Sequence, residues 1–173
     1  MIYLLVLAAV LTRFVPHLPN FSPVYGVLLV GGAYLKSRDA VWYPVAILAI
    51  SDVLLTTQVY KMHVGWTQSI VWLGFAAVAL CGRWLRGRIS VATVLAASVV
   101  APLVFFVISN FAVWLDWKLY PTTWAGLVAC YVAAVPFLGH SLASSVGFTA
   151  ALFSALHFYK KKRADDGFKR SLA

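Results

Sequence analysis

The chain has 173 residues, of which 62% are hydrophobic and only 11% are charged. A soluble domain carries charge on about a quarter of its residues, so this composition excludes an ordinary soluble protein and indicates an integral membrane protein. The net charge of +9 comes from short basic clusters between apolar runs, which act as topology signals in a lipid bilayer and exclude nucleic acid as the partner.

Short polar breaks divide the chain into apolar runs, and these predict an all-α integral membrane protein with six transmembrane helices. The runs are Ile2–Val15, Phe21–Leu35, Ala40–Tyr60, Trp66–Leu85, Val91–Leu115 and Thr123–Tyr159. No Lys or Arg precedes the first run, so we interpret it as a retained membrane helix and not as a signal peptide. Residues 1–159 then form a single transmembrane domain, and residues 160–173 form a basic cytoplasmic tail.

The last run has 37 residues, which is too long for one crossing of a bilayer and barely long enough for two. Pro136 interrupts it, and a proline removes an intrahelical hydrogen bond and clashes with the preceding turn. We therefore predict a shorter helix over Thr123–Val135 at the outer face, followed by a sixth span over Phe137–Tyr159.

The positions of the basic residues predict the orientation of these helices. With the N-terminus inside, the cytoplasmic connections and the tail carry 11 of the 14 Lys and Arg residues, whereas the outer connections carry only Arg13, Lys61 and Lys118. Cytoplasmic loops are enriched in Lys and Arg. The sequence thus predicts cytoplasmic N- and C-termini in a bacterial inner (cytoplasmic) membrane.

Aromatic and polar residues gather around the outer connections. An aromatic belt at the level of the lipid headgroups would explain the aromatic residues alone. Aromatic walls with a few polar groups are also the composition of a small-molecule pocket. The candidate substrate-binding residues are Asn20, Tyr25, Asp52, Tyr60, His63, Trp66, Asn110, Trp114, Trp117 and Trp124.

Asp52 is the most informative of these residues, because a carboxylate inside an apolar run is costly and often functional. It stands about two helical turns from the predicted outer end of its helix. Two roles stay open: contact with a ligand, or a structural ion pair with Arg13 or Lys61. Asn20 can instead cap the following helix, and His63 can simply face solvent.

Small residues recur every four positions along the sixth predicted span, at Gly139, Ala143, Gly147 and Ala151. Such a face lets another helix approach closely. We expect it to pack within the chain, and docking of a separate subunit is the alternative.

Motifs for catalysis or for an intrinsic cofactor are missing from the sequence. The segment from residue 30 to residue 37 (VGGAYLKS) resembles a phosphate-binding loop but has Leu35 where glycine is required before Lys36. Neither the four histidines nor Cys81 and Cys130 have the spacing of a metal site. We therefore expect transport or binding, with no enzyme activity and no cofactor of the protein's own.

Several short segments along most of the chain form a pattern of their own. They are Arg13–Val24 (RFVPHLPNFSPV), Gly31–Tyr34 (GGAY), Pro44, Ser51–Asp52, Tyr120–Pro121, Gly126 and Pro136–Phe137. Together they resemble a family of uncharacterised bacterial transport proteins, which are similar to the S components of energy-coupling factor (ECF) transporters. This resemblance implies a six-helix bundle with an outward pocket for a vitamin, served by a membrane scaffold subunit and two ATPases.

Within that class the chain is most similar to cobalamin transporters of Gram-negative bacteria, which can work without a dedicated scaffold. The resemblance implies uptake of cobalamin or another corrinoid, and in that group a cysteine near the pocket can ligate cobalt. Cys81 and Cys130 do not fall in the outer loop after the third span, which leaves His63 as the hypothetical axial ligand. Two alternatives stay open: a small membrane enzyme or cofactor-bearing subunit, and a structural subunit of a membrane complex.

Overall fold

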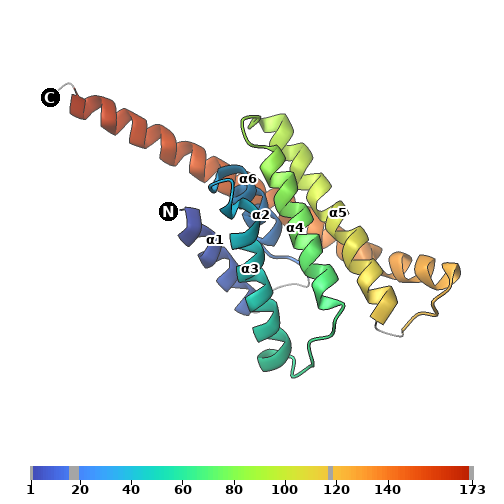
Figure 1. The fold of residues 1–173 in the computed structure, drawn as a ribbon. Helices are drawn as coiled ribbons and strands as arrows, with labels where there is room; N and C mark the ends of the chain where they lie inside the picture. Colours follow the sequence, from blue (N-terminus) through green and yellow to red (C-terminus); the bar gives the residue numbers. More distant parts are fainter. Residues whose placement is uncertain (1, 16–19, 117–118, 172–173) are drawn as a thin grey trace.

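The computed structural model describes residues 2–15, 20–116 and 119–171, with side chains up to Asp166, and these residues form an all-α protein (Figure 1). Six helices confirm the predicted fold class at this level. They are α1 (Ile2–Leu11), α2 (Val24–Tyr34), α3 (Asp39–Leu54), α4 (Gln68–Trp84), α5 (Val91–Asp116) and α6 (Trp124–Ser171). A short 3₁₀ turn, η1 (Thr12–Phe14), extends α1, and a π-helical turn, η2 (Leu55–Val59), extends α3.

Three helical segments are long and apolar enough to cross a membrane. They are Asp39–Val59, Val91–Asp116 and Trp124–Asp166. The helices α1 and α2 are apolar but shorter, and the 11 residues of α2 span only about 16 Å, roughly half of a bilayer's hydrocarbon core. The chain thus has the helices of a multi-pass membrane protein, whereas the number of crossings and their orientation stay predictions.

Helix α2 forms the centre of the bundle, and ten of its 11 residues are buried. It contacts each of the other five helices, which surround it (Figure 1). Its closest neighbour is α4, because a Cβ atom added at Gly82 would lie 2.6 Å from the carbonyl oxygen of Leu29. Only glycine allows two helix backbones to approach so closely.

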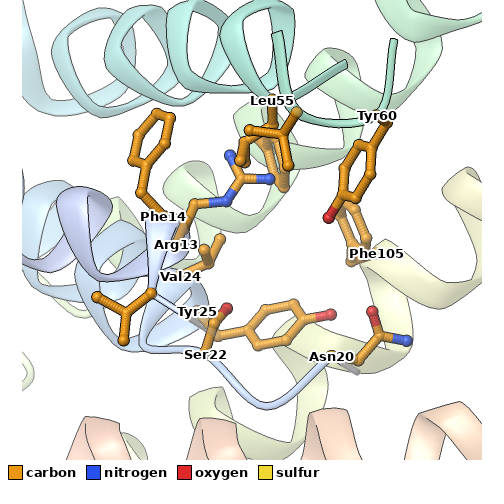
Figure 2. Close-up of a pocket in the computed structure, with 12 residues that line it drawn as sticks. Arg13, Phe14, Asn20, Ser22, Val24, Tyr25, Leu55, Tyr60 and Phe105 are labelled. Atoms are coloured by element: carbon orange, nitrogen blue, oxygen red, sulfur yellow. The ribbon is translucent and has the colours of Figure 1, made fainter. Parts of the chain in front are cut away.

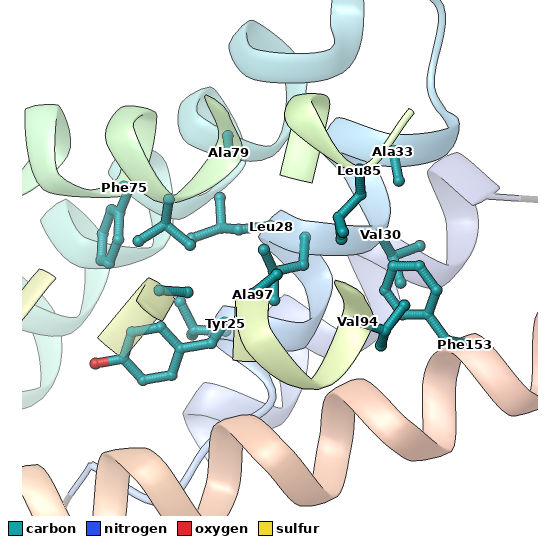
Figure 3. Close-up of a cluster of buried hydrophobic side chains, with 14 of the residues drawn as sticks. Tyr25, Leu28, Val30, Ala33, Phe75, Ala79, Leu85, Val94, Ala97 and Phe153 are labelled. Atoms are coloured by element: carbon teal, nitrogen blue, oxygen red, sulfur yellow. The ribbon is translucent and has the colours of Figure 1, made fainter. Parts of the chain in front are cut away.

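The hydrophobic core is built around this central helix (Figure 3). Side chains of α4, α5 and α6 close around those of α2, so the whole described bundle shares one core. Its labelled members are Tyr25, Leu28, Val30, Ala33, Phe75, Ala79, Leu85, Val94, Ala97 and Phe153. This core holds the helices together, and the cavities lie between the helix ends and the loops that connect them.

The prediction that Pro136 divides the last run is wrong, because α6 continues through it for 48 residues. Pro44 lies inside α3 and Pro102 inside α5 in the same way. Apolar helices of membrane proteins tolerate internal proline, because neighbouring groups and local adjustments satisfy the freed carbonyl. The same helix extends to Ser171, so most of the predicted basic tail is helical, and its cytoplasmic location stays a prediction.

The small-residue face of α6 does not pack within the chain as expected. Gly139, Ala143, Gly147 and Ala151 are exposed, and no atom of the described chain lies within 4 Å of a Cβ added at Gly139 or Gly147. The buried face of α6 is a different one. It presents Ser141, Ser144, Ser145 and Thr149, and Ser145 donates a hydrogen bond of 2.7 Å to the carbonyl oxygen of Ser98 on α5.

Candidate functional site

Two neighbouring cavities lie at the end of the bundle where α1 leads to α2, α3 to α4 and α5 to α6. The first cavity has a volume of about 530 Å³ and the second about 540 Å³. Asn20, Tyr25 and Phe105 line both, so the two cavities share one wall. Within that wall the rings of Tyr25 and Phe105 meet edge to face, with centroids 5.8 Å apart.

The first cavity collects side chains from α2, α4 and α5, from the helical turns η1 and η2, and from two connections (Figure 2). The hydroxyl groups of Tyr25 and Tyr60 point into it from opposite sides, and Arg13 closes it beside Leu55. Its full lining is Arg13, Phe14, Val15, Asn20, Ser22, Val24, Tyr25, Leu55, Val59, Tyr60, Phe75 and Phe105. The lining is therefore mostly apolar and aromatic, with a small number of polar groups.

The backbone around the first cavity departs from regular helix where it supplies lining residues. The π-helical turn η2 ends α3, and such turns occur frequently at functional sites. It presents Leu55 and Val59 to the cavity, and Lys61, with φ of +54°, then ends the helix. Asn20 has φ of +59°, a left-handed conformation that asparagine adopts more readily than most residues.

Arg13 and Asp52 form an ion pair beside the first cavity. Arg13 also donates a hydrogen bond of 2.6 Å to the hydroxyl of Ser51. The second carboxylate oxygen of Asp52 accepts hydrogen bonds from Gln68 at 3.0 Å and from Trp72 at 3.3 Å. A buried charge is stable only when it is paired and hydrogen-bonded, and Asp52 meets that requirement with three donors: Arg13 on η1, and Gln68 and Trp72 on α4.

This pair leaves the cavity close to electrically neutral. Asp52 lines neither cavity, and only 7% of its side chain is exposed, whereas Arg13 reaches the lining with 17% exposed. Arg13 is the one charged residue on either lining within the described part of the chain. Of the two roles that the sequence left open for Asp52, the geometry corresponds to the structural pair with Arg13.

The second cavity lies between α5 and the first half of α6. Asn110 donates its side-chain amide to the carbonyl oxygen of Phe106 at 2.8 Å, and Cys130 donates its thiol to the backbone carbonyl of Asn110 at 3.5 Å. Ser109, Tyr120 and Ser141 add hydroxyl groups to the apolar lining. The second cavity thus matches the first in composition but has no charged residue among the described ones.

The predicted site residues divide into two groups in the structure. Asn20, Tyr25, Tyr60 and Asn110 line a cavity. Others line neither cavity: these are Asp52, the exposed residues His63, Trp66 and Trp124, and Trp114, which donates to the carbonyl oxygen of Pro121 at 3.0 Å. Trp117 lies outside the described residues.

Sequence reasoning missed the two phenylalanines that form the aromatic wall. Phe75 on α4 and Phe105 on α5 stack with centroids 5.0 Å apart, and the guanidinium of Arg13 lies 6.0 Å from the Phe75 ring centre. Both residues stand in the middle of apolar runs, where nothing in the sequence distinguishes a cavity wall from lipid contact or core. The described residues contain no cluster of three or more metal-binding side chains.

The apolar helices and this pair of aromatic cavities define the class: a multi-pass membrane protein with a small-molecule-sized site at one end of its bundle. The chain belongs to DUF6580, a family of unknown function, whose profile matches residues 1–166. No curated protein and no solved structure matches the chain significantly.

Proposed function

We propose that the protein captures a small organic molecule from outside the cell, as the binding subunit of an uptake system similar to the S components of ECF transporters. The pair of aromatic cavities carries this proposal. Each has a volume within the usual range for ligand pockets, about 300–1,000 Å³, and the typical lining of apolar walls with a few polar groups.

The distribution of basic residues supports an outward-facing site. The cavities lie at the end of the bundle that holds the connections between α1 and α2, α3 and α4, and α5 and α6. The loop between α4 and α5 and the end of α6 lie at the other end, and they carry most of the basic residues (Figure 1). Basic loops stay cytoplasmic, so the cavities would open to the outside.

A vitamin is the proposed substrate, and a corrinoid is the best single candidate on the strength of the sequence resemblance. The neutral, aromatic lining suits an uncharged ring system better than a simple anion or cation, because an unpaired charge there would lose its hydration without a counter-charge. His63 lines neither cavity, so it is not a candidate for the cobalt ligand of a bound corrinoid. A scaffold subunit and ATPases would supply the energy for release.

Binding of vitamins to the detergent-purified protein tests this proposal. Cyanocobalamin, cobinamide, riboflavin, biotin and thiamine are titrated against the wild type, Tyr25→Phe and Tyr43→Phe. We expect one vitamin to bind, and Tyr25→Phe to weaken it by roughly two- to tenfold, because a typical hydrogen bond contributes about 0.5–1.5 kcal/mol.

Tyr43→Phe is the matched control, because the Tyr43 hydroxyl donates to the carbonyl oxygen of Tyr3 at 3.1 Å, away from both cavities. It should bind as the wild type does. A folded, monodisperse protein that binds none of these vitamins would refute vitamin capture.

A second candidate function rests on the exposed face of α6. The stripe of small residues at Gly139, Ala143, Gly147 and Ala151 is open to an approaching helix, as a structural subunit of a membrane complex requires. On this alternative Gly147→Leu would break co-purification with a partner, while Tyr25→Phe would change nothing.

A further inference from the structure

A third cavity, of about 520 Å³, lies at the opposite end of the bundle from the two aromatic cavities. It is bounded by the first turn of α1, the end of α2 and the part of α6 after Leu156. The N-terminus and the C-terminal half of α6 lie at this same end in Figure 1. This cavity has no role in the proposed function.

Three cations line the third cavity: Lys36, Lys160 and Arg163. Among the residues with described side chains, none of the three lies within 4 Å of a carboxylate, since Arg13 and Asp52 form the one salt bridge there. The nearby Asp39 instead accepts a hydrogen bond from Tyr3, at 2.5 Å. Three cations around one concavity repel one another, so an anion placed between them would be stabilised.

Aromatic groups hold part of this cluster in place. The ammonium group of Lys160 lies 3.9 Å from the centre of the Tyr34 ring, a cation–π contact that fixes the lysine over the cavity. Tyr3 and Tyr159 also line it. Tyrosine is enriched where membrane proteins meet the headgroup layer, so this cavity has the composition of a site at that depth.

The remaining lining of the third cavity is apolar. Ile2, Leu35, Leu156 and Ala164 form it, and of these Leu35 and Leu156 are buried. A free inorganic anion would gain nothing from these side chains. A ligand with an anionic head and a hydrocarbon tail would match both parts of the lining at once.

We infer that the third cavity binds the phosphate headgroup of an anionic phospholipid of the cytoplasmic leaflet. Lys36, Lys160 and Arg163 contact the phosphate, and the apolar part of the lining, with Ile2 at its edge, faces the upper acyl chain. Basic pockets beside membrane helices recognise anionic lipids in this way. This inference does not depend on the substrate of the aromatic cavities.

Native mass spectrometry of the full chain in detergent, with added phosphatidylglycerol, tests the inference. Two double variants remove the same charge from the same helix: Lys160→Ala/Arg163→Ala takes both cations from the cavity, and Lys161→Ala/Lys162→Ala takes two that line none of it. We expect at least a tenfold loss of bound phosphatidylglycerol in the first variant and less than a twofold loss in the second. Equal losses in the two variants would overturn the site, because they would show an attraction that depends on net charge alone.

A second pair of single variants guards against a folding defect. Lys36→Gln and Arg38→Gln both change exposed residues beside α3, but only Lys36 lines the cavity. Lys36→Gln should reduce lipid binding more than Arg38→Gln at an unchanged melting temperature, and equal binding in the two would contradict the inference.

Two competitors distinguish the possible ligands. Phosphatidylcholine should fail to displace phosphatidylglycerol, because its headgroup carries no net negative charge. Inorganic phosphate at millimolar concentration should fail as well, because it lacks the acyl chain. Displacement by inorganic phosphate would make the site one for a soluble phosphate and would overturn the assignment to a lipid.

Discussion

The two ends of the bundle handle charge in opposite ways. At the end with the aromatic cavities, Arg13 is neutralised by Asp52, which is itself saturated by Gln68 and Trp72. At the other end, Lys160 and Arg163 line a cavity, and neither of them lies within 4 Å of a carboxylate, as far as described side chains extend. Because Asp52 neutralises Arg13, the first site is close to neutral. Because no carboxylate pairs with Lys160 and Arg163, we expect an external anion to bind between them.

The basic end also contains a cation, Arg86, whose guanidinium is held by hydrogen bonds to the chain. Arg86 donates to the hydroxyl of Ser37 at 2.6 Å and to the carbonyl oxygen of Gly32 at 3.2 Å. It also donates to the carbonyl oxygen of Leu35, so it caps the last turn of α2. A cation at a helix C-terminus satisfies free carbonyls and interacts favourably with the helix dipole. Arg86 is therefore architectural, unlike the cations of the third cavity.

The largest loss of stability is expected when the ion pair between Arg13 and Asp52 is broken. Asp52→Ala leaves Arg13 without its counter-charge, and breaking a buried ion pair costs about 3–5 kcal/mol. We expect a melting temperature in detergent many degrees below that of the wild type, and a partial recovery in Arg13→Ala/Asp52→Ala, which removes both charges. Asp166→Ala, at an exposed position on α6, is the control and should melt as the wild type does. A melting temperature of Asp52→Ala within one degree of the wild type would show that the pair is not structural.

A smaller loss of stability is expected when the contact between the loop after η2 and the end of α5 is removed. The hydroxyl of Thr67, which is buried, donates to the carboxylate of Asp116. Thr67→Val keeps the shape but removes the donor, and a hydrogen bond to a charged group contributes about 1.5–3 kcal/mol.

Thermal unfolding of Thr67→Val should reveal this loss when it is compared with Ser69→Ala. Ser69 is exposed and donates only to Trp66 in its own turn, at 2.6 Å. Equal melting temperatures for the two variants would mean that the connection between Thr67 and Asp116 does not hold this end of the bundle together.

Much of the fold could be predicted from the sequence, because apolar runs and their polar breaks mark helices directly. The helices α1 to α5 fall within or close to the predicted runs. The break at Pro136 was wrong, since proline acts on one hydrogen bond and one turn, while the apolar sequence on both sides of it favours a continuous helix. The exposure of the face at Gly139 and Gly147 could not be predicted, because the spacing of small residues shows that a face is small but not what covers it.

The candidate site was predictable only in part, because its lining depends on the tertiary arrangement of the helices. Polar residues such as Asn20 and Asn110 stand out in an apolar sequence, and the structure places them on cavity walls. Phe75 and Phe105 do not stand out, because their role depends on how α4 and α5 are rotated toward α2. His63 and Trp66 belong to a predicted outer connection but line neither cavity, because the composition of a loop does not determine the direction in which it turns.

The central claim is that a ligand binds in the aromatic cavities, and filling one of them tests it most directly. Ala134 lines the second cavity, whereas Ala129, on the same helix, is exposed and lines neither. Equilibrium binding of cyanocobalamin to Ala134→Trp and Ala129→Trp should show binding abolished in the first and kept in the second, at equal melting temperatures. Equal binding by both variants would contradict the account, because a molecule unaffected by a filled cavity does not bind there.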